Sequence, residues 1–471
     1  MVSTISRRPA PESIHGSLLP SACTVEEVAM HNRLDPYWDQ LWAPGSQASW
    51  ASTRTARTRK DNGWGRVNAK FLLSRKDAMR LIMSNRRRAG RLATWAVLNS
   101  WTSVSAEQLA AFTGSRYVLD PRGSTIAASF ALDLLDIGGF PNPLAAIPNP
   151  DRNYLYRAAR SDAFDKHIVD TLTWPEWASV TGGYGWASGG QYDRHNVLAA
   201  ELALRVAEYL PIGAILGEKF STVDLLAGSG LGRTVKRPDN RRADGTIVRS
   251  DGMRIALELT ATTSRALESK VRRWARLLTE RSLETSGLTI LFVAAPHPDR
   301  KLGGGKDPRR GIYETVRGIL KEFPGRGPDS AAARIGLISW AELFPGPREL
   351  SERFFHLEAD FMLGSGNGPG RWMTRRMLTD YTFEPWRTFD ATAVVDNARI
   401  LAASPHWMRT GDRTHLIGTP EDRAGVPVPH PTPVRPHLAK GRPLGAGTGR
   451  AGDARLPARL RLVTTQPESP R

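Results

Sequence analysis

The amino-acid sequence predicts an α+β protein with at least two folded domains. Its 471 residues exceed what one hydrophobic core usually supports. Apolar residues recur at helical spacing between about 76 and 140, whereas helical and buried-strand patterns alternate between about 193 and 345. From about 420 onward the chain is rich in Pro, Gly and Arg, a composition that cannot build a packed core.

These patterns divide the chain into six segments. The expected division is a largely disordered basic arm over 1–70, a three-helix domain over 71–150, an aromatic-rich connector over 151–192, an α/β domain over 193–345, a partly helical extension over 346–419 and a disordered basic tail over 420–471. The aromatic side chains of the connector are expected to be packing residues, and stacking on nucleobases is the alternative.

The charge of the chain is strongly positive and unevenly distributed. The formal net charge is +18, and the stretch from Arg54 to Arg91 holds thirteen Arg and Lys against only Asp61 and Asp77, a net +11. Such a cluster attracts polyanions through counterion release and long-range attraction. Nucleic acid is therefore the expected partner, although an acidic membrane surface would attract the same charge.

The sequence argues against membrane insertion, an internal disulfide and a cysteine-based zinc site. The sequence has no run of about 20 apolar residues and no N-terminus of signal-peptide type, so we expect a cytoplasmic protein without membrane insertion. Cys23 is the only cysteine. It excludes an internal disulfide and a cysteine-based zinc site assembled from this chain alone.

Three short helices with tight turns are expected in the first block. One runs to about Trp101, and Ser105 with Gln108 has the spacing of a capping box that starts the second, which Gly114 ends. The third is predicted by apolar residues at i, i+4, i+8 and i+11 and would end at Gly138-Gly139; these residues are Ile126, Phe130, Leu134 and Ile137. The pattern is typical of a helix-turn-helix, and a following hairpin would make it a winged helix.

A helix-turn-helix would place its third helix in the major groove of DNA. The residues left to face DNA by the apolar stripe are Arg122, Ser124, Thr125 and Ser129, and those expected to hold phosphates are Arg86, Arg87, Arg88 and Arg91. Any small three-helix unit has the same pattern, and the adjacent basic cluster is what favours DNA binding.

The second block is expected to be an α/β domain built around a strand hairpin. An amphipathic helix should begin just after His195, and the apolar runs at 288–295 and 334–340 should be buried strands joined by a crossover helix. Between these elements, Ser250-Asp251-Gly252 is expected to form a three-residue hairpin loop that pairs Arg249 with Met253.

The register of this hairpin places two acidic residues together. Continuing the pairing from Arg249 and Met253 sets Asp244 opposite Glu258 on one face of the sheet. Like charges in this position repel unless a cation lies between them. We therefore expect Asp244 and Glu258 to bind Mg²⁺, with Mn²⁺ as a substitute, which can polarise a phosphodiester and activate water.

The segment from 193 to 345 resembles the PD-(D/E)xK nuclease superfamily, whose core is a helix, a strand hairpin carrying Asp and then Glu-x-Lys, a helix and further strands. In this sequence Ala243-Asp244 stands at the Pro-Asp position, Glu258 is the second acid, and Thr260 occupies the Lys position. The resemblance implies catalytic roles for Asp244 and Glu258, and for Lys270 as a lysine that has migrated to the following helix. Asp239 and Glu218 are further acids near the hairpin.

The order of a winged helix, a connector leading to Arg194-His195 and this hairpin, over about 75 to 345, is also similar to the replication-relaxation family of plasmid and mobile-element proteins. That resemblance implies DNA binding in replication, mobilisation or transfer, with replication or conjugation proteins as partners. Two alternatives stay open: an inactive scaffold with the nuclease fold, which Thr260 favours, and a winged-helix transcription regulator. The sequence does not indicate the oligomeric state.

Overall fold

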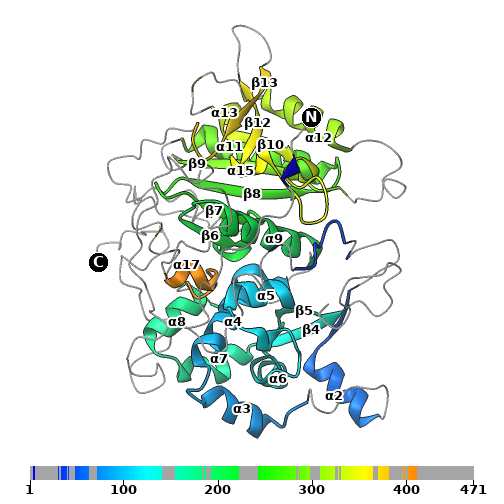
Figure 1. The fold of residues 1–471 in the computed structure, drawn as a ribbon, viewed down its shortest axis with the longest axis vertical. Coiled ribbons are helices and arrows are strands. Elements are labelled where there is room, and N and C mark those ends of the chain that lie inside the picture. The colour runs from blue at the N-terminus through cyan, green and yellow to red at the C-terminus, as the bar shows by residue number, and fades with distance from the viewer. Residues whose placement is uncertain are drawn as a thin grey trace.

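The protein has a mixed α/β fold, seen in a computed structural model (Figure 1). Its described residues form two larger β-sheets and a two-stranded one, in which β1 (Thr4–Ile5) pairs with β11 (Leu350–Ser351). The structure describes residues 4–5, 30, 33–39, 41, 48–62, 72–139, 154–182, 185–186, 193–221, 242–282, 285, 287–296, 308–323, 327, 330–363, 370–380, 395, 398 and 401–410. Within these residues no helix combines the length and the apolar character needed to cross a bilayer.

The larger sheet has seven strands in the order β13-β12-β10-β9-β8-β7-β6. Its three central strands, β8, β9 and β10, are parallel, and the strands on either side are antiparallel. The bounds are β6 Ala214–Gly217, β7 Gly245–Val248, β8 Arg254–Thr260, β9 Leu288–Ala294, β10 Ile335–Ser339, β12 Glu358–Leu363 and β13 Arg371–Arg376. The two strands predicted from apolar runs are thus present as β9 and β10.

The hairpin of β7 and β8 has the predicted register. Gly245 pairs with Leu257 and Val248 with Arg254, and the Arg249 amide donates to the Met253 carbonyl. Gly252 adopts φ +83°, a left-handed conformation that glycine reaches without a Cβ penalty. The turn therefore fixes which residues of the two strands face each other.

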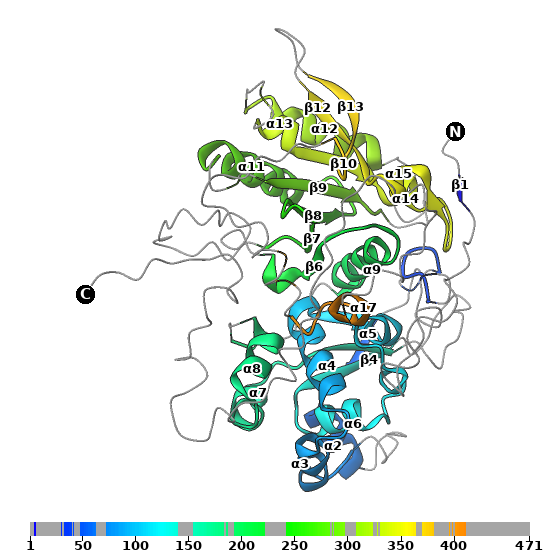
Figure 2. The same ribbon diagram turned by 60° about the vertical axis from the view of Figure 1, so that its left-hand side comes forward.

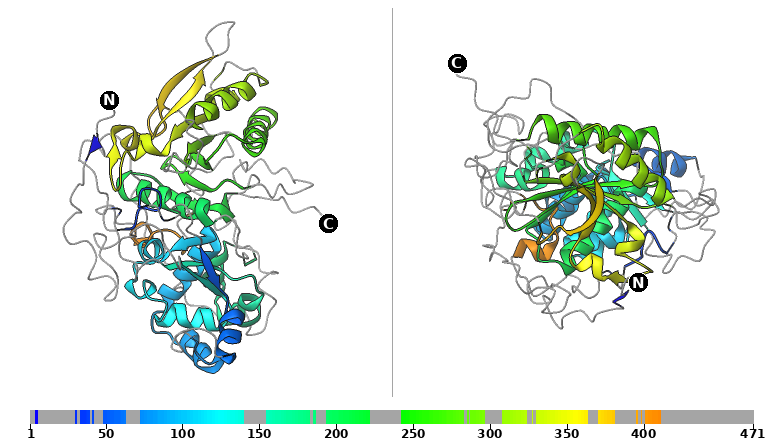
Figure 3. Two further views of the ribbon diagram at one scale, coloured as in Figure 1. Left: turned by 90° about the vertical axis from the view of Figure 1, so that its right-hand side faces the viewer. Right: turned by 90° about the horizontal axis from the view of Figure 1, so that it is seen from above.

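Helices cover both faces of this sheet. Successive side chains of a strand point to opposite faces, and every residue of β8 and β9 is buried, so both faces must be covered. On one face, α11 (Arg265–Glu280) and α12 (Pro308–Leu320) lie beside each other and pack on Ala256 of β8 (Figure 3). On the other face, α9 (Asp193–Tyr209) packs in a core that includes Ile255 and Leu257. The amphipathic helix expected after His195 is α9.

The smaller sheet has four strands in the order β2-β4-β5-β3 and is accompanied by α4, α5 and α6. The bounds are β2 Ser49–Ala51, β3 Ser103–Ser105, β4 Leu135–Gly139, β5 Tyr154–Ala158, α4 Arg88–Trp101, α5 Ala106–Thr113 and α6 Ser124–Ala131. The predicted capping box of Ser105 and Gln108 starts α5, and Gly114 ends it in the left-handed conformation.

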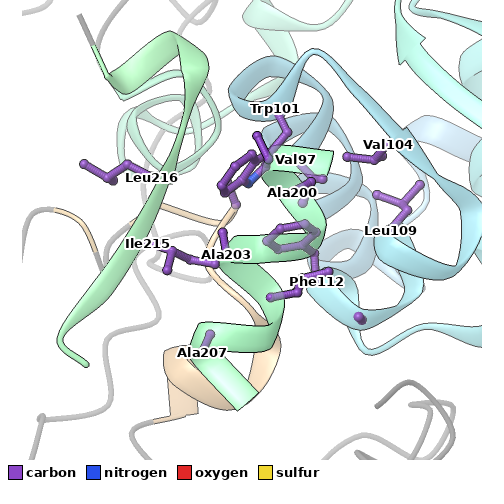
Figure 4. Packing of buried hydrophobic residues seen from close by; sticks show 14 of the residues in the cluster. Val97, Trp101, Val104, Leu109, Phe112, Ala200, Ala203, Ala207, Ile215 and Leu216 are labelled. Carbon is purple, nitrogen blue, oxygen red and sulfur yellow. The ribbon is translucent and has the colours of Figure 1, made fainter. Parts of the chain in front are cut away.

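The two parts of the chain share one hydrophobic core, with α9 between the larger sheet and the N-terminal helices (Figure 2). Figure 4 shows Trp101 and Phe112 of the N-terminal helices packed with Ala203 of α9 and Ile215 of β6. The expected connector over 151–192 contributes structure to the N-terminal part, since β5 completes its sheet and α8 (Trp174–Thr181) packs on α4. Its described aromatic side chains are buried or half-buried, as the packing interpretation requires.

The third helix is shorter than predicted. It ends at Ala131, and Ile137 and Gly138 lie in strand β4. Asp133, with φ +63°, separates the two elements. Leu134 is buried and Ile137 is half-buried, in line with the predicted apolar stripe. Apolar spacing alone, however, does not distinguish a helix from a helix followed by a strand.

The prediction that residues 1–70 form a largely disordered arm is wrong for part of this segment. Ser49–Ala51 forms strand β2 against β4, and Thr53–Asp61 forms helix α2, capped by the Ser52 side chain. Nearby, Arg33 and Asp35 are almost fully buried in ion pairs with α9. Pairing and buried charges hold this segment in place although its sequence lacks apolar periodicity.

The segment 346–419 differs from the expected helical extension because its strands β12 and β13 extend the larger sheet. Helix α15 (Glu352–Phe355) precedes them, and α17 (His406–Thr410) packs on α5. The predicted disordered tail over 420–471 lies outside the described residues.

Candidate active site

Asp244 and Glu258 are brought together by the hairpin of the larger sheet. Asp244 directly precedes β7, and its backbone amide donates to the Leu257 carbonyl at 2.8 Å. Its Oδ2 accepts from the Leu259 amide at 2.6 Å. These two bonds on either side of Glu258 fix Asp244 opposite it, as the register predicts.

Helix α11 supplies the partners of the Glu258 carboxylate, which is only 2% exposed. The Lys270 ammonium donates to Oε2 at 2.5 Å, and the Trp274 indole N–H donates to Oε1 at 2.7 Å. Lys270 and Trp274 are one helical turn apart and therefore project from the same side of α11. The Lys270 Nζ also lies 3.9 Å from Asp244 Oδ2, so one cation bridges both acids.

Burial dominates the electrostatics of this cluster. It raises the pKa of Glu258 to about 7; Lys270 opposes this shift, and the charge of Asp244 adds to it. Burial by itself would lower the pKa of Lys270, but Glu258 and Asp244 outweigh it and raise that pKa above its ordinary value. Lys270 is therefore a fixed cation at neutral pH, and Glu258 is a carboxyl that can change its charge there.

Two further titratable side chains lie close enough to feel these charges. Burial lowers the pKa of His195, at the start of α9, with Asp244 and Lys270 acting in opposite directions. Burial and then the charge of Asp244 raise the pKa of Glu218, whose Oε2 accepts from the Thr102 hydroxyl at 3.3 Å. Glu218 thus belongs to the surroundings of the site, and Asp239 lies outside the described residues.

The donor set of the site fits a hard cation with few protein ligands. Among the described residues no three His, Cys, Asp or Glu side chains form a metal-ligand group. Mg²⁺ commonly takes only one or two carboxylates and keeps water or substrate phosphate as its other ligands. Asp244, with 15% of its side chain exposed, and Glu258 are the two carboxylates that would hold it, with Lys270 giving up part of its contact to Glu258.

The structure overturns two of the predicted DNA-facing positions and one of the predicted phosphate-binding positions. Thr125 and Ser129 of α6 are buried, and the Ser129 hydroxyl bonds the Trp95 indole N–H at 3.0 Å. The guanidinium of Arg91 is also buried and donates to the carbonyls of Arg86, Ile82 and Ser84. These side chains hold the helices together and do not reach a solvent-exposed surface.

Helix α6 as a whole is in the wrong place for a major-groove helix. All of its residues except Ser124, which is half-buried, are buried. Helix α3 (Arg75–Met83) packs along it, and the α2 side chains of Thr53 and Arg57 bond the carbonyls at its C-terminal end. The apolar pattern identified the buried stripe but not the helices that cover the opposite side.

The remaining predicted phosphate-binding cations differ in availability. Arg88 holds Glu176 with two hydrogen bonds of 2.5 and 2.7 Å, which makes it a structural residue. Arg87 lies over the Tyr117 ring at 3.7 Å, and Arg122 is exposed but paired with Asp120. Arg86 is exposed. Arg86 and Arg122 are thus the predicted cations that solvent reaches freely.

Sequence reasoning missed Trp274 and His195 as members of the site. The position of Trp274 one turn after Lys270 on an amphipathic helix was a usable signal. His195 had no such signal, because its proximity depends on how α9 crosses the sheet. Comparisons with protein-family models, curated proteins and solved structures returned no match to this chain.

Proposed function

We propose that this protein is a DNA-binding, divalent-metal-dependent endonuclease of the PD-(D/E)xK type that acts in replication, mobilisation or transfer of a plasmid or mobile element. The observation that carries the catalytic part is the convergence of Asp244, Glu258 and Lys270. Two acids and a lysine at the end of a strand hairpin are the groups that metal-assisted phosphodiester hydrolysis uses. The biological setting rests on the resemblance stated from the sequence.

The topology around the site supports the same proposal. Helix α9 is followed by the antiparallel strands β6, β7 and β8, then by α11 and by β9 parallel to β8. This is the order of a helix, a hairpin carrying the acids, a second helix and a further strand on which the resemblance was based. Lys270 on α11 supplies the cation that contacts Glu258, whereas Thr260 stands at the Lys position of the strand.

Each side chain has a distinct role in the proposed reaction. A bound Mg²⁺ or Mn²⁺ supplies polarisation of the phosphodiester and activation of water. Asp244 and Glu258 hold that ion, and Trp274 orients Glu258 through its indole N–H. Lys270 stays protonated, so it attracts a phosphate oxygen and does not accept a proton. His195, whose pKa is lowered by burial and which interacts electrostatically with Asp244 and Lys270, is a candidate neutral base beside these groups.

The N-terminal part supports DNA binding by its topology. From α4 to β5 its helices and strands follow the order helix, strand, helix, helix, strand, strand, after β2, α2 and α3, and β3 pairs with β5 next to β4. A winged helix has this order, with the last two strands as the wing. The burial of α6 means that DNA must contact other elements of this part.

A second candidate function keeps the fold and drops the chemistry. Both oxygens of Glu258 are satisfied by protein donors, and Lys270 with Trp274 would stabilise the fold equally well without a metal. In that case the larger sheet is a docking scaffold in a replication or conjugation complex. Thr260 at the Lys position favours this alternative.

A nicking assay separates the two candidates. Supercoiled plasmid is incubated with the purified protein and Mg²⁺ or Mn²⁺. Asp244→Ala and Glu258→Ala are compared with Glu314→Ala, which removes an exposed carboxylate of α12 that pairs with Arg310. We expect metal-dependent nicking by the wild type and by Glu314→Ala, and none by the other two, with DNA affinity unchanged. Absence of nicking in the wild type, with intact DNA binding, rules out the endonuclease and favours the scaffold.

A further inference from the structure

Helix α2 (Thr53–Asp61) carries a dense set of exposed cations. Its sequence TRTARTRKD contains four basic residues and a single acid at its last position. The exposed cations are Arg54, Arg57, Arg59 and Lys60. This helix is one end of the basic cluster that gives the chain much of its positive charge.

The helix is firmly attached to the N-terminal part. The Thr53 hydroxyl donates to the Phe130 carbonyl, and Arg57 Nη2 donates to the Ala131 carbonyl at 3.1 Å. Ala56 is buried, and the preceding strand β2 pairs with β4. The exposed cations are therefore presented on a rigid support and not on a free arm.

These cations also lack the acidic partners that other surface helices provide. Arg272 of α11 pairs with Glu322, just after α12, and Arg310 pairs with Glu314 within α12. Among the described residues, no ion pair involves Arg54, Arg57, Arg59 or Lys60. Clustered like charges repel each other, and Asp61 is the single acid of this helix, so an external polyanion would account for an arrangement in which these cations form no ion pair among the described residues.

The position of α2 suits the DNA-binding role that α6 cannot take. Helices α2 and α3 lie at the end of the molecule beyond α6, far from the larger sheet (Figures 1 and 2). They cover α6 and occupy the solvent side of the N-terminal part. A nine-residue helix is about 13 Å long, and that length of duplex carries on the order of eight backbone charges.

We propose that α2 binds the backbone phosphates of duplex DNA through Arg54, Arg59 and Lys60, in place of the groove contact expected of α6. This inference rests on the proposed function for its partner, DNA, and adds the surface that binds it. The contacts are electrostatic and carry no sequence information, because phosphates are the same at every step. Arg57 contributes charge while anchoring the helix to Ala131.

The test is a salt titration with charge-neutral variants. The triple variant Arg54→Gln, Arg59→Gln, Lys60→Gln keeps good helix formers and spares the anchors Thr53 and Arg57. Its matched control, Arg310→Gln, Arg317→Gln, Lys321→Gln, removes the same charge from the exposed surface around α12, at the other end of the molecule. Binding of both full-length proteins and the wild type to a labelled 30-base-pair duplex is followed by anisotropy, with circular dichroism to verify folding.

We expect the α2 variant to flatten the plot of log K against log salt by about three units and to bind about a hundredfold more weakly at 0.15 M salt, because each phosphate contact contributes close to one unit. The control variant should keep the wild-type slope. Equal losses in both variants, or none in the α2 variant, overturn the inference. A loss for RNA or for vesicles with anionic lipid that is larger than for DNA overturns the assigned partner.

Failure of the inference is distinguishable from failure of the proposed function. If the wild type binds and nicks DNA while the α2 variant behaves like it, only the binding surface is wrong. If the wild type binds no DNA at any salt concentration, both the proposed function and the DNA surface are wrong. If the α2 variant loses binding but nicks at high protein concentration, the surface and the active site are separate, as proposed.

Discussion

Lys270 reaches across from α11 to place its Nζ 2.5 Å from Glu258 Oε2, joining residues twelve positions apart in sequence. The Glu258 side chain is buried, whereas the Lys270 side chain is 27% exposed. A strand residue and a helix residue thereby form one electrostatic unit. The same lysine bridges to Asp244, so its removal affects both acids.

Substituting Lys270→Met should destabilise the protein by about 3 kcal/mol at pH 8, because a buried carboxylate loses its charged partner. The loss should shrink below pH 7, where Glu258 takes up a proton and no longer needs the cation. Urea unfolding with EDTA present, at pH 5.5 and 8, measures both values. A penalty that is the same at the two pH values contradicts a charged pair and indicates lost packing alone.

The hairpin that creates this unit could be predicted from the sequence, since a turn and strict alternation determine it. Once Gly252 occupies the left-handed position of a three-residue loop, Asp244 and Glu258 must face each other. Local chemistry therefore gave both acids. Lys270 was proposed from the family resemblance, and α11 places its Nζ 2.5 Å from Glu258 Oε2.

Contacts between distant segments explain what the sequence could not predict. Helix α6 has the apolar stripe of a helix packed on one side, yet α2 and α3 cover its other side. Side chains of α2 donate to backbone carbonyls of α6, and α3 packs along it. Carbonyl groups are present in every sequence and leave no pattern. For the same reason Arg91, which donates to three carbonyls, resembled a surface cation until the fold was known.

Arg33 should be a large stabilising contributor although it lies in the segment expected to be disordered. It is 1% exposed and pairs with Glu201, at 3.0 Å, and with Glu208 of α9. Arg33→Met leaves two buried carboxylates without their shared cation, and we expect a loss of about 3–5 kcal/mol in the free energy of unfolding. Chemical denaturation measures it, with the exposed pair of Arg80 as the control, since Arg80→Met should change nothing measurable.

The opposite result would be informative about the N-terminal segment. If Arg33→Met unfolds with the wild-type free energy, the segment around Arg33 does not dock on α9 in solution. The interpretation of residues 33–39 as part of the core would then be wrong.

Glu208 should make stability fall as the pH rises from about 4.5 to 7. Burial raises its pKa to about 7 against an ordinary value of 4.5, so in this window the folded protein binds more protons there than the unfolded chain does. Its contribution to the free energy of unfolding therefore decreases with pH, by at most about 1.4 kcal/mol per pH unit. Glu208→Gln, which cannot titrate, should remove that slope in a series of urea unfolding curves.

Glu201 is the matched control, because it shares Arg33 but shifts in the other direction. Burial alone would raise its pKa, yet Arg33 and Arg205 lower it to about 2. The contribution of Glu201 to the free energy of unfolding is complete above about pH 4.5 and is lost only as the pH falls from there toward 2. Glu201→Gln should therefore lower the free energy of unfolding throughout the pH range from 5 to 7 without changing its slope against pH. Parallel curves for wild type and Glu208→Gln would contradict the raised pKa.

Gly252 links the turn to the candidate active site, and replacing it tests both together. With φ +83° the position penalises any Cβ, so Gly252→Ala should cost about 1–2 kcal/mol, and Gly252→Asn less, because Asn tolerates left-handed backbone better. If the hairpin keeps its register at this cost, nicking survives. A one-residue slip would instead turn Asp244 away from Glu258 and move the buried side chains of β7 to the opposite face, so nicking would disappear together with a much larger loss of stability. Thermal unfolding beside the plasmid assay separates the two outcomes, and a Gly252→Ala protein as stable as the wild type would show that this turn does not hold the acids in place.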